Sequence, residues 1–88
     1  MPAEALAPTR ALTNEIRLLR FLSQDMTQAD LGRRVGLTRQ TIAAIEQGRY
    51  SPSIDVAFRI ADVFGKRIDE VFLWTPVGAG GSPPGAEG

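Results

Sequence analysis

The stretch from Gln28 to Arg49 constrains the fold most, because its capping residues, glycines and apolar positions follow the spacing of two short helices joined by a tight turn. Thr27 can cap the first helix, and Asp30 three residues later completes a Thr-x-x-Asp capping box. Gly36 stands where that helix would end with a positive φ angle, which glycine adopts easily. The sequence therefore predicts a short helix that ends just before this glycine.

A second helix is predicted after the turn, with Thr38 as its cap. Two helices that cross closely need a small residue at the crossing, and Gly32 fits, although glycine inside a helix costs about 1 kcal/mol relative to alanine. The apolar positions of the two helices and the turn are Leu31, Val35, Leu37, Ile42 and Ile45. This pattern matches a helix-turn-helix, which many proteins use to hold a helix against DNA.

Helical spacing predicts three further helices and no strand, so the expected fold is all-α with five helices. The first covers Asn14–Leu22 with Thr13 as its cap, the fourth follows Ser53 and ends at Gly65, and the last covers Ile68–Phe72. Within the 88 residues we expect a disordered N-terminal arm (1–10), one folded domain (11–75) and a disordered Gly/Pro-rich tail (76–88).

The composition argues against several classes of protein. The chain has no cysteine and no histidine, which removes disulfides, thiolate zinc sites and the commonest general base. We therefore expect no enzyme, catalytic residue, metal, cofactor or small-molecule ligand. No apolar run approaches the roughly 20 residues that cross a bilayer, and the first residues do not resemble a signal peptide. A cytoplasmic protein without a membrane segment is the expectation.

The formal net charge is zero, which is unusual for a protein that binds nucleic acid. The predicted motif is nevertheless locally basic, with only Asp30 and Glu46 opposing its arginines. Those arginines are Arg33, Arg34, Arg39 and Arg49. The low overall charge predicts modest non-specific affinity for DNA, because that affinity scales with the number of phosphates neutralised.

The run MTQADLGRRVGLTRQTIAAIEQGRYSPSIDVAFRIADVFG, followed by IDEVF, resembles the Cro/C1-type, or XRE-like, helix-turn-helix transcriptional regulators. The resemblance implies a compact five-helix lambda-repressor-like domain that binds operator DNA as a homodimer. It implies a transcriptional regulator, expected to act as a repressor or autoregulator by occupying its operator. Two features depart from the family pattern: the link SQDM before Thr27 is one residue longer, and Arg67 replaces a Ser or Thr cap.

Three residues of the second motif helix are predicted to read bases. The guanidinium of Arg39 can donate two hydrogen bonds to guanine, and Gln40 can pair with adenine. Ala44, one turn later, can offer a methyl contact to thymine. The alternatives are a solvated surface arginine and an alanine that serves helix propensity alone.

The predicted phosphate contacts are Gln28, Thr38, Thr41, Arg49 and Tyr50. Gln28 heads the first motif helix, and the resemblance implies that Arg49 and Tyr50 lie along the sugar-phosphate backbone. Each has a simpler alternative, since Gln28 is also an ordinary polar residue for a helix start and Thr38 is satisfied by capping alone.

Other residues are predicted to shape the domain. Glu46 would repel phosphate if it faced DNA, so we expect it to pair with Arg20 of the first helix, while Gly32 and Gly36 shape the motif. For Trp74 two interpretations are open, a lid over the protein's own core or an anchor for a dimer. Phe21 and Leu22 are equally ambiguous.

The leading hypothesis is a small regulator whose partners are double-stranded DNA and a second copy of itself. The alternative is an antitoxin subunit or another protein-interaction module with the same fold, for which DNA binding is secondary. An enzyme is the weakest hypothesis, because no base, nucleophile and pocket converge in the sequence.

Overall fold

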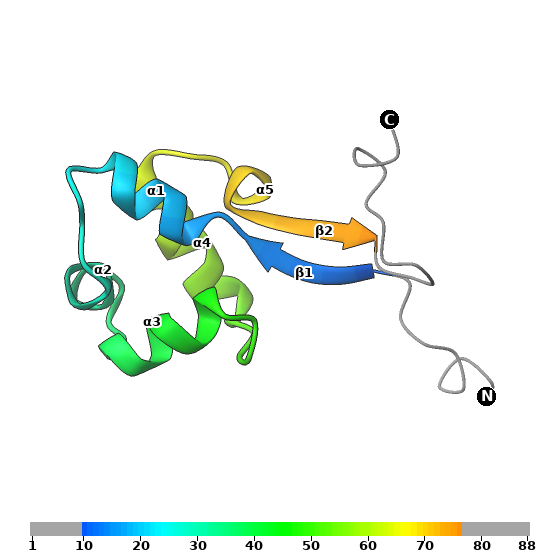
Figure 1. Ribbon diagram of the computed structural model, residues 1–88, viewed down its shortest axis with the longest axis horizontal. Helices are drawn as coiled ribbons and strands as arrows, with labels where there is room; N and C mark the ends of the chain where they lie inside the picture. The colour runs from blue at the N-terminus through cyan, green and yellow to red at the C-terminus, as the bar shows by residue number, and fades with distance from the viewer. Residues whose placement is uncertain (1–9, 77–88) are drawn as a thin grey trace.

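The computed structural model describes residues 10–76, which form five helices and two short strands (Figure 1). The predictions for residues 1–9 and 77–88 lie outside the described residues. In chain order the elements are β1 (Arg10–Asn14), α1 (Ile16–Leu22), α2 (Gln28–Val35), α3 (Arg39–Glu46), α4 (Ile54–Phe64), α5 (Ile68–Val71) and β2 (Phe72–Pro76).

The five helices pack around a small apolar core. All five helices contribute fully buried side chains to it, and these are Ile16, Leu31, Ile42, Ile45, Ile60 and Val71. Among the described residues, the members of this core are all apolar. Four of the five predicted apolar positions of the motif are buried, and Leu37 is half-buried against the same core. The helical periodicity therefore identified the core face of the motif correctly.

The prediction of a fold without strands was wrong. β1 pairs antiparallel with β2, from Arg10 opposite Pro76 to Asn14 opposite Phe72, and the two strands form a ribbon that extends from the helical body (Figure 1). The strands come from opposite ends of the domain, so no local turn signals their pairing. Phe72, predicted as the end of the last helix, instead begins β2, because α5 ends at Val71.

The start of α1 also differs from the prediction. Asn14 ends β1, and its side-chain oxygen accepts a hydrogen bond from the backbone N–H of Ile16 at 3.1 Å. Its side-chain amide donates to the carbonyl of Ile45 at 3.0 Å, which ties the ribbon to α3. Thr13 is not a cap, because its hydroxyl meets that of Thr75 across the ribbon at 2.8 Å.

The interpretation of Trp74 as a lid over the core was wrong, because its side chain on β2 is 63% exposed. Phe21 and Leu22 on α1 are equally solvent-exposed. These side chains contribute little to the core and are available for other contacts.

Candidate nucleic-acid interface

Helix α2 begins with the predicted capping box. The Thr27 hydroxyl accepts a hydrogen bond from the backbone N–H of Asp30 at 2.9 Å, and the Asp30 carboxylate accepts one from the backbone N–H of Thr27 at 3.3 Å. The two bonds satisfy N–H groups that a helix start leaves without partners. The capping box therefore fixes the start of α2 at Gln28.

The turn between α2 and α3 is closed by backbone hydrogen bonds to a single carbonyl. Gly36 adopts a φ of 82°, and its N–H and that of Leu37 both donate to the carbonyl of Gly32 at 2.8 Å. A Cβ atom at Gly32 would lie 2.5 Å from the Leu37 carbonyl oxygen, so only glycine allows this approach. Thr38 then caps α3 by accepting from the backbone N–H of Thr41 at 3.1 Å.

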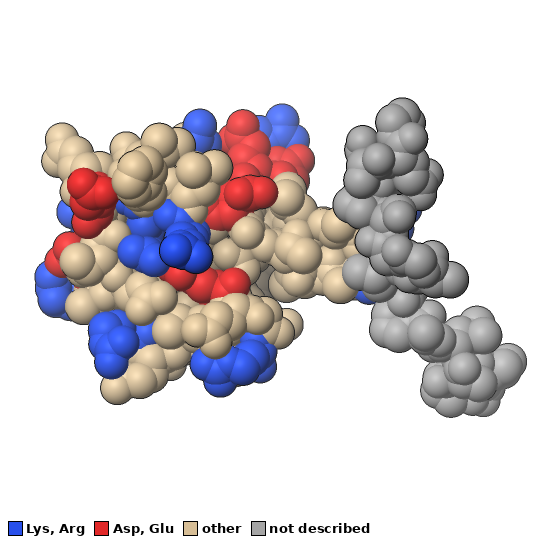
Figure 2. Space-filling model, viewed as in Figure 1, with Lys and Arg blue, Asp and Glu red and all other residues tan. Residues whose placement is uncertain are grey.

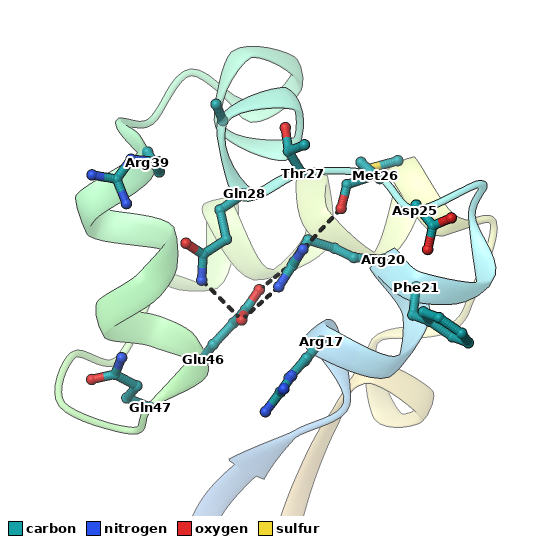
Figure 3. Close-up of a pocket in the computed structure, with 11 residues that line it drawn as sticks. Arg17, Arg20, Phe21, Asp25, Met26, Thr27, Gln28, Arg39, Glu46 and Gln47 are labelled. Atoms are coloured by element: carbon teal, nitrogen blue, oxygen red, sulfur yellow. Dashed lines mark hydrogen bonds and ion pairs between the residues drawn. The ribbon is translucent and has the colours of Figure 1, made fainter.

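The predicted ion pair between Arg20 and Glu46 joins α1 to α3 (Figure 3). The guanidinium of Arg20 donates to both carboxylate oxygens, at 2.6 and 3.1 Å, and also to the carbonyl of Met26 at 2.8 Å. The side-chain amide of Gln28 donates to the same carboxylate at 3.2 Å. Because Arg20, Glu46 and Gln28 lie on three different helices, this cluster, here called the brace, fixes α3 against α1 and α2.

The brace also holds the longer link between α1 and α2. Gln24 and Asp25 both have positive φ angles, 60° and 57°, which cost about 1 kcal/mol or more each for residues other than glycine. The carbonyl of Arg20 accepts from the backbone N–H groups of Ser23 and Met26 at 3.0 and 2.9 Å. The link between α1 and α2 is therefore held by backbone hydrogen bonds to Arg20 and by the bond from the Arg20 guanidinium to the Met26 carbonyl.

One side of α3 is turned away from the core. Ile42 and Ile45 are buried, whereas Arg39 and Gln40 are exposed at the first turn of the helix. Ala44, one turn after Gln40, is half-buried. The three predicted base-reading residues thus lie on the part of α3 that does not pack against the core.

Beside α3 lies an open hollow of about 700 Å³ between α1, α2 and α3. Its floor is formed by the brace, and Arg17, Arg39 and Gln47 lie around it (Figure 3). The acidic charge of Glu46 is neutralised by Arg20, so the charges left at this hollow are those of Arg17, Arg39 and one carboxylate, Asp25, and their sum is positive. Such a surface suits a phosphate backbone.

The arginines outside the brace differ in whether a carboxylate lies within ion-pair distance. Three exposed arginines pair with aspartates on their own helix or at its start, in the pairs Arg33–Asp30, Arg59–Asp55 and Arg67–Asp69. Within residues 10–76, no carboxylate pairs with Arg17, Arg39 or Arg49. Figure 2 shows basic side chains spread over the region of α1, α2 and α3 with acidic ones among them, and a further group of acidic side chains near α5. Arg10 and Arg34 also have no carboxylate partner among the described residues, so three of five such arginines are near α3: Arg17 lines the hollow, Arg39 begins α3 and Arg49 follows its end.

Of the predicted phosphate-contacting residues only Gln28 lines the hollow, and several of the five are already hydrogen-bonded. Gln28 is part of the brace, and the hydroxyls of Thr38 and Thr41 lie 3.0 Å apart. Arg49 donates through Nε to the side-chain oxygen of Gln47 at 2.9 Å, and Tyr50 is exposed beyond it.

Two residues of this surface were not identified from the sequence as candidates for binding. Arg17 lies one turn before Arg20 on α1, and Gln47 follows the last residue of α3. Both line the hollow. The spacing of Arg17 and Arg20 was a usable signal, because residues three apart on a helix share a face.

The capping box predicts a pH dependence that can be measured. Hydrogen bonds from the Thr27 hydroxyl and then from its backbone N–H lower the pKa of Asp30 below the ordinary 3.8, with Arg33 and Arg34 adding a smaller effect. A carboxyl group with a lowered folded-state pKa stabilises the fold above its unfolded pKa, and this stabilisation is lost as the pH falls through the folded pKa. We therefore expect an NMR titration to give Asp30 a pKa below 3.8 in the wild type. In Thr27→Ala the pKa should rise toward 3.8, and an equal pKa in both proteins would contradict the assignment.

In the described part of the chain, no cluster of three or more acidic, histidine or cysteine side chains is suited to hold a metal ion. No helix among residues 10–76 has the length and apolar character to span a membrane.

Known protein families and structures match this chain over most of the described domain. Residues 16–71 match the family model described as helix-turn-helix. An uncharacterized HTH-type transcriptional regulator from Methanocaldococcus jannaschii is 43% identical over 63 residues, which cover 72% of this chain and 94% of the relative. Another from Methanothermobacter thermautotrophicus is 51% identical over 55 residues, covering 61% of this chain and 80% of the relative.

The fold itself is also found in solved structures. A crystal structure of a protein from Bacteroides fragilis superposes with a TM-score of 0.61 at 18% identity, covering 69% of this chain and 97% of that one. The similarity supports the same arrangement of helices. On the family match and the curated relatives together, the chain belongs to the Cro/C1-type helix-turn-helix family of transcriptional regulators.

Proposed function

We propose that this protein binds double-stranded DNA sequence-specifically as a homodimer in the cytoplasm, and acts as a repressor or autoregulator by occupying its operator. The observation that carries the proposal is a helix, α3, that is capped, braced and presents Arg39 and Gln40 on its exposed side. A binding helix must keep its geometry while its polar groups stay free for bases, and α3 meets both requirements.

In this proposal α3 enters the major groove with its first turn foremost. Arg39 donates to O6 and N7 of a guanine, Gln40 pairs with an adenine, and Ala44 contacts a thymine methyl group. The exposure of Arg39 and Gln40 supports these roles, because neither side chain has to leave a partner within the described residues. Ala44 offers little surface, so part of the specificity rests on DNA shape.

The hollow beside α3 is proposed to receive the sugar-phosphate backbone. Gln28, Arg17 and Gln47 line the hollow and are assigned to phosphates there. Thr38, Thr41, Arg49 and Tyr50, which lie outside the hollow at the two ends of α3 and on α3 itself, are assigned to further phosphates. Gln28 has a double role, since one N–H of its amide holds Glu46 and the other is free to donate to a phosphate.

A selection of duplexes from random sequence tests the proposal. The homodimer should recover a two-fold symmetric site whose half-sites are about 34 Å apart, one turn of the DNA helix. Binding to that duplex should weaken steeply as salt rises, because bound arginines release counterions. Recovery of no preferred duplex at low salt would refute sequence-specific binding, and an asymmetric site would refute the dimeric mode alone.

Replacing Arg39 with alanine should weaken binding to the selected duplex about tenfold, or about 1.4 kcal/mol, through the loss of a bidentate contact to guanine. Fluorescence anisotropy with the selected duplex measures the change. A duplex altered at the base pair that Arg39 reads should be bound equally by both proteins. The matched control is Arg67→Ala, immediately before α5, where the arginine already pairs with Asp69, and it should bind as the wild type does. Equal losses for the two variants would contradict the assignment.

A further inference from the structure

The ribbon carries an exposed apolar pair that the proposed DNA contacts do not use. Leu12 on β1 lies directly opposite Trp74 on β2, and their side chains are 40% and 63% exposed. Side chains alternate between the faces of a strand, so this pair shares its face with Phe72, which is buried in the core. The apolar surface of the core therefore continues outward along one face of the ribbon into solvent.

We propose that this ribbon face is where a second copy of the chain docks. The inference names the contact surface of the homodimer proposed above and rests on that part of the proposed function. In a two-fold dimer the same patch meets itself, so it must be self-complementary. The alternating positions of this face, from the register, are Arg10, Leu12 and Asn14 on β1 and Phe72, Trp74 and Pro76 on β2. This face has no carboxylate, and its single charge, that of Arg10, lies at the outer end of the ribbon. Two copies can therefore meet through Leu12 and Trp74 without opposing like charges at the centre.

A second copy fits this surface better than the chain's own remaining segments. Residues 1–9 and 77–88 contain only three large aliphatic side chains, Met1, Leu6 and Val77, with which to cover an indole and a leucine. A two-stranded ribbon is also only marginally stable by itself in water, and a tryptophan buried at an interface is a frequent source of binding energy. Packing against the ribbon of a second copy would bury Leu12 and Trp74.

The position of the ribbon is compatible with DNA binding by both copies. The ribbon extends away from α2 and α3 (Figure 1), and none of its exposed apolar side chains lines the hollow beside α3. A partner on the ribbon therefore leaves Arg39 and Gln40 uncovered.

Trp74 is the only tryptophan, so its fluorescence reports on this surface directly. We expect the emission of the full chain to shift to longer wavelength on dilution, at the same concentration at which sedimentation equilibrium shows dimers becoming monomers. A blue-shifted emission from a monomer would mean that the chain covers Trp74 itself, and a red-shifted emission from a dimer would mean that the contact lies elsewhere. Either result overturns the proposal.

A substitution of Trp74 tests the ribbon contact independently of its fluorescence. Trp74→Glu should weaken dimerisation at least about 30-fold, the effect of removing a hot-spot side chain, while circular dichroism shows an unchanged helix content. The matched control is Phe58→Glu, an aromatic residue 53% exposed on α4, which should leave the dimer intact. A dimer that survives Trp74→Glu would overturn the ribbon contact and leave the homodimer standing. A wild type that sediments only as a monomer would overturn both, with DNA binding by α3 still tested separately by the selection.

Discussion

Replacing Glu46 with alanine is expected to lower the free energy of unfolding by about 3 kcal/mol, because the charge of Arg20 would lie between three helices without a carboxylate partner. The side chains of Arg20 and Glu46 are only 16% and 7% exposed, so water cannot readily replace the lost carboxylate. Arg20 would keep its bond to the Met26 carbonyl, and Gln28 would lose its partner. Urea denaturation followed by circular dichroism measures the change.

The control for this substitution is Asp55→Ala on α4. Asp55 also pairs with an arginine, Arg59, at 2.7 Å, but both side chains are more than half exposed, and such pairs contribute under about 1 kcal/mol. The account would be contradicted if both substitutions lowered the free energy of unfolding equally. Replacing Arg20 and Glu46 together by methionine and leucine should recover much of the loss, because no buried charge is then left without a partner.

Replacing Gly32 with alanine is expected to destabilise the fold by about 2 to 3 kcal/mol, although alanine is the better helix former by about 1 kcal/mol. The new methyl group would lie 2.5 Å from the carbonyl oxygen of Leu37 and 3.4 Å from the carbonyl carbon of Thr38. Both are backbone atoms of the turn, so the clash can be relieved only by moving α3 relative to α2. Thermal or urea unfolding should therefore show a loss of stability, and DNA affinity should fall with it.

Gly48→Ala is the comparison for Gly32→Ala. Gly48 has a φ of 77°, and a Cβ atom there would meet nothing within 4 Å. Gly48→Ala is therefore expected to lower the free energy of unfolding by only about 1 kcal/mol, the cost of placing a residue with a Cβ atom in a left-handed conformation. If Gly32→Ala instead raised the stability, as helix propensity alone predicts, the close approach of α2 to the turn would be refuted.

The helix-turn-helix could be predicted from sequence because its signals are local. The caps at Thr27 and Thr38 and the left-handed Gly36 each act within about three residues, and the structure has all three where they were expected. The β1–β2 ribbon could not be predicted in this way, since Leu12 and Trp74 are brought together only once α1 to α5 have packed. Strand pairing at that separation has no turn residue to mark it.

The candidate site was predictable to a similar extent. Arg39 and Gln40 follow from their place at the start of α3, and the pair between Arg20 and Glu46 follows from the unfavourable position of an acid near DNA. The role of Arg17 depends on how α1 lies beside α3, which only the packed structure specifies. For Gln28 the sequence left open a phosphate contact or an ordinary polar residue at a helix start, and its bond to Glu46 adds a structural role that neither interpretation included.

The central claim is that the exposed side of α3 binds DNA, and an NMR titration of isotopically labelled protein with the selected duplex tests it most directly. The account predicts that the largest amide shifts fall on Thr38 to Ala44 and on the start of α2, with small shifts on α5. Shifts concentrated on the exposed side of α4 or on the ribbon, with α3 unaffected, would contradict it.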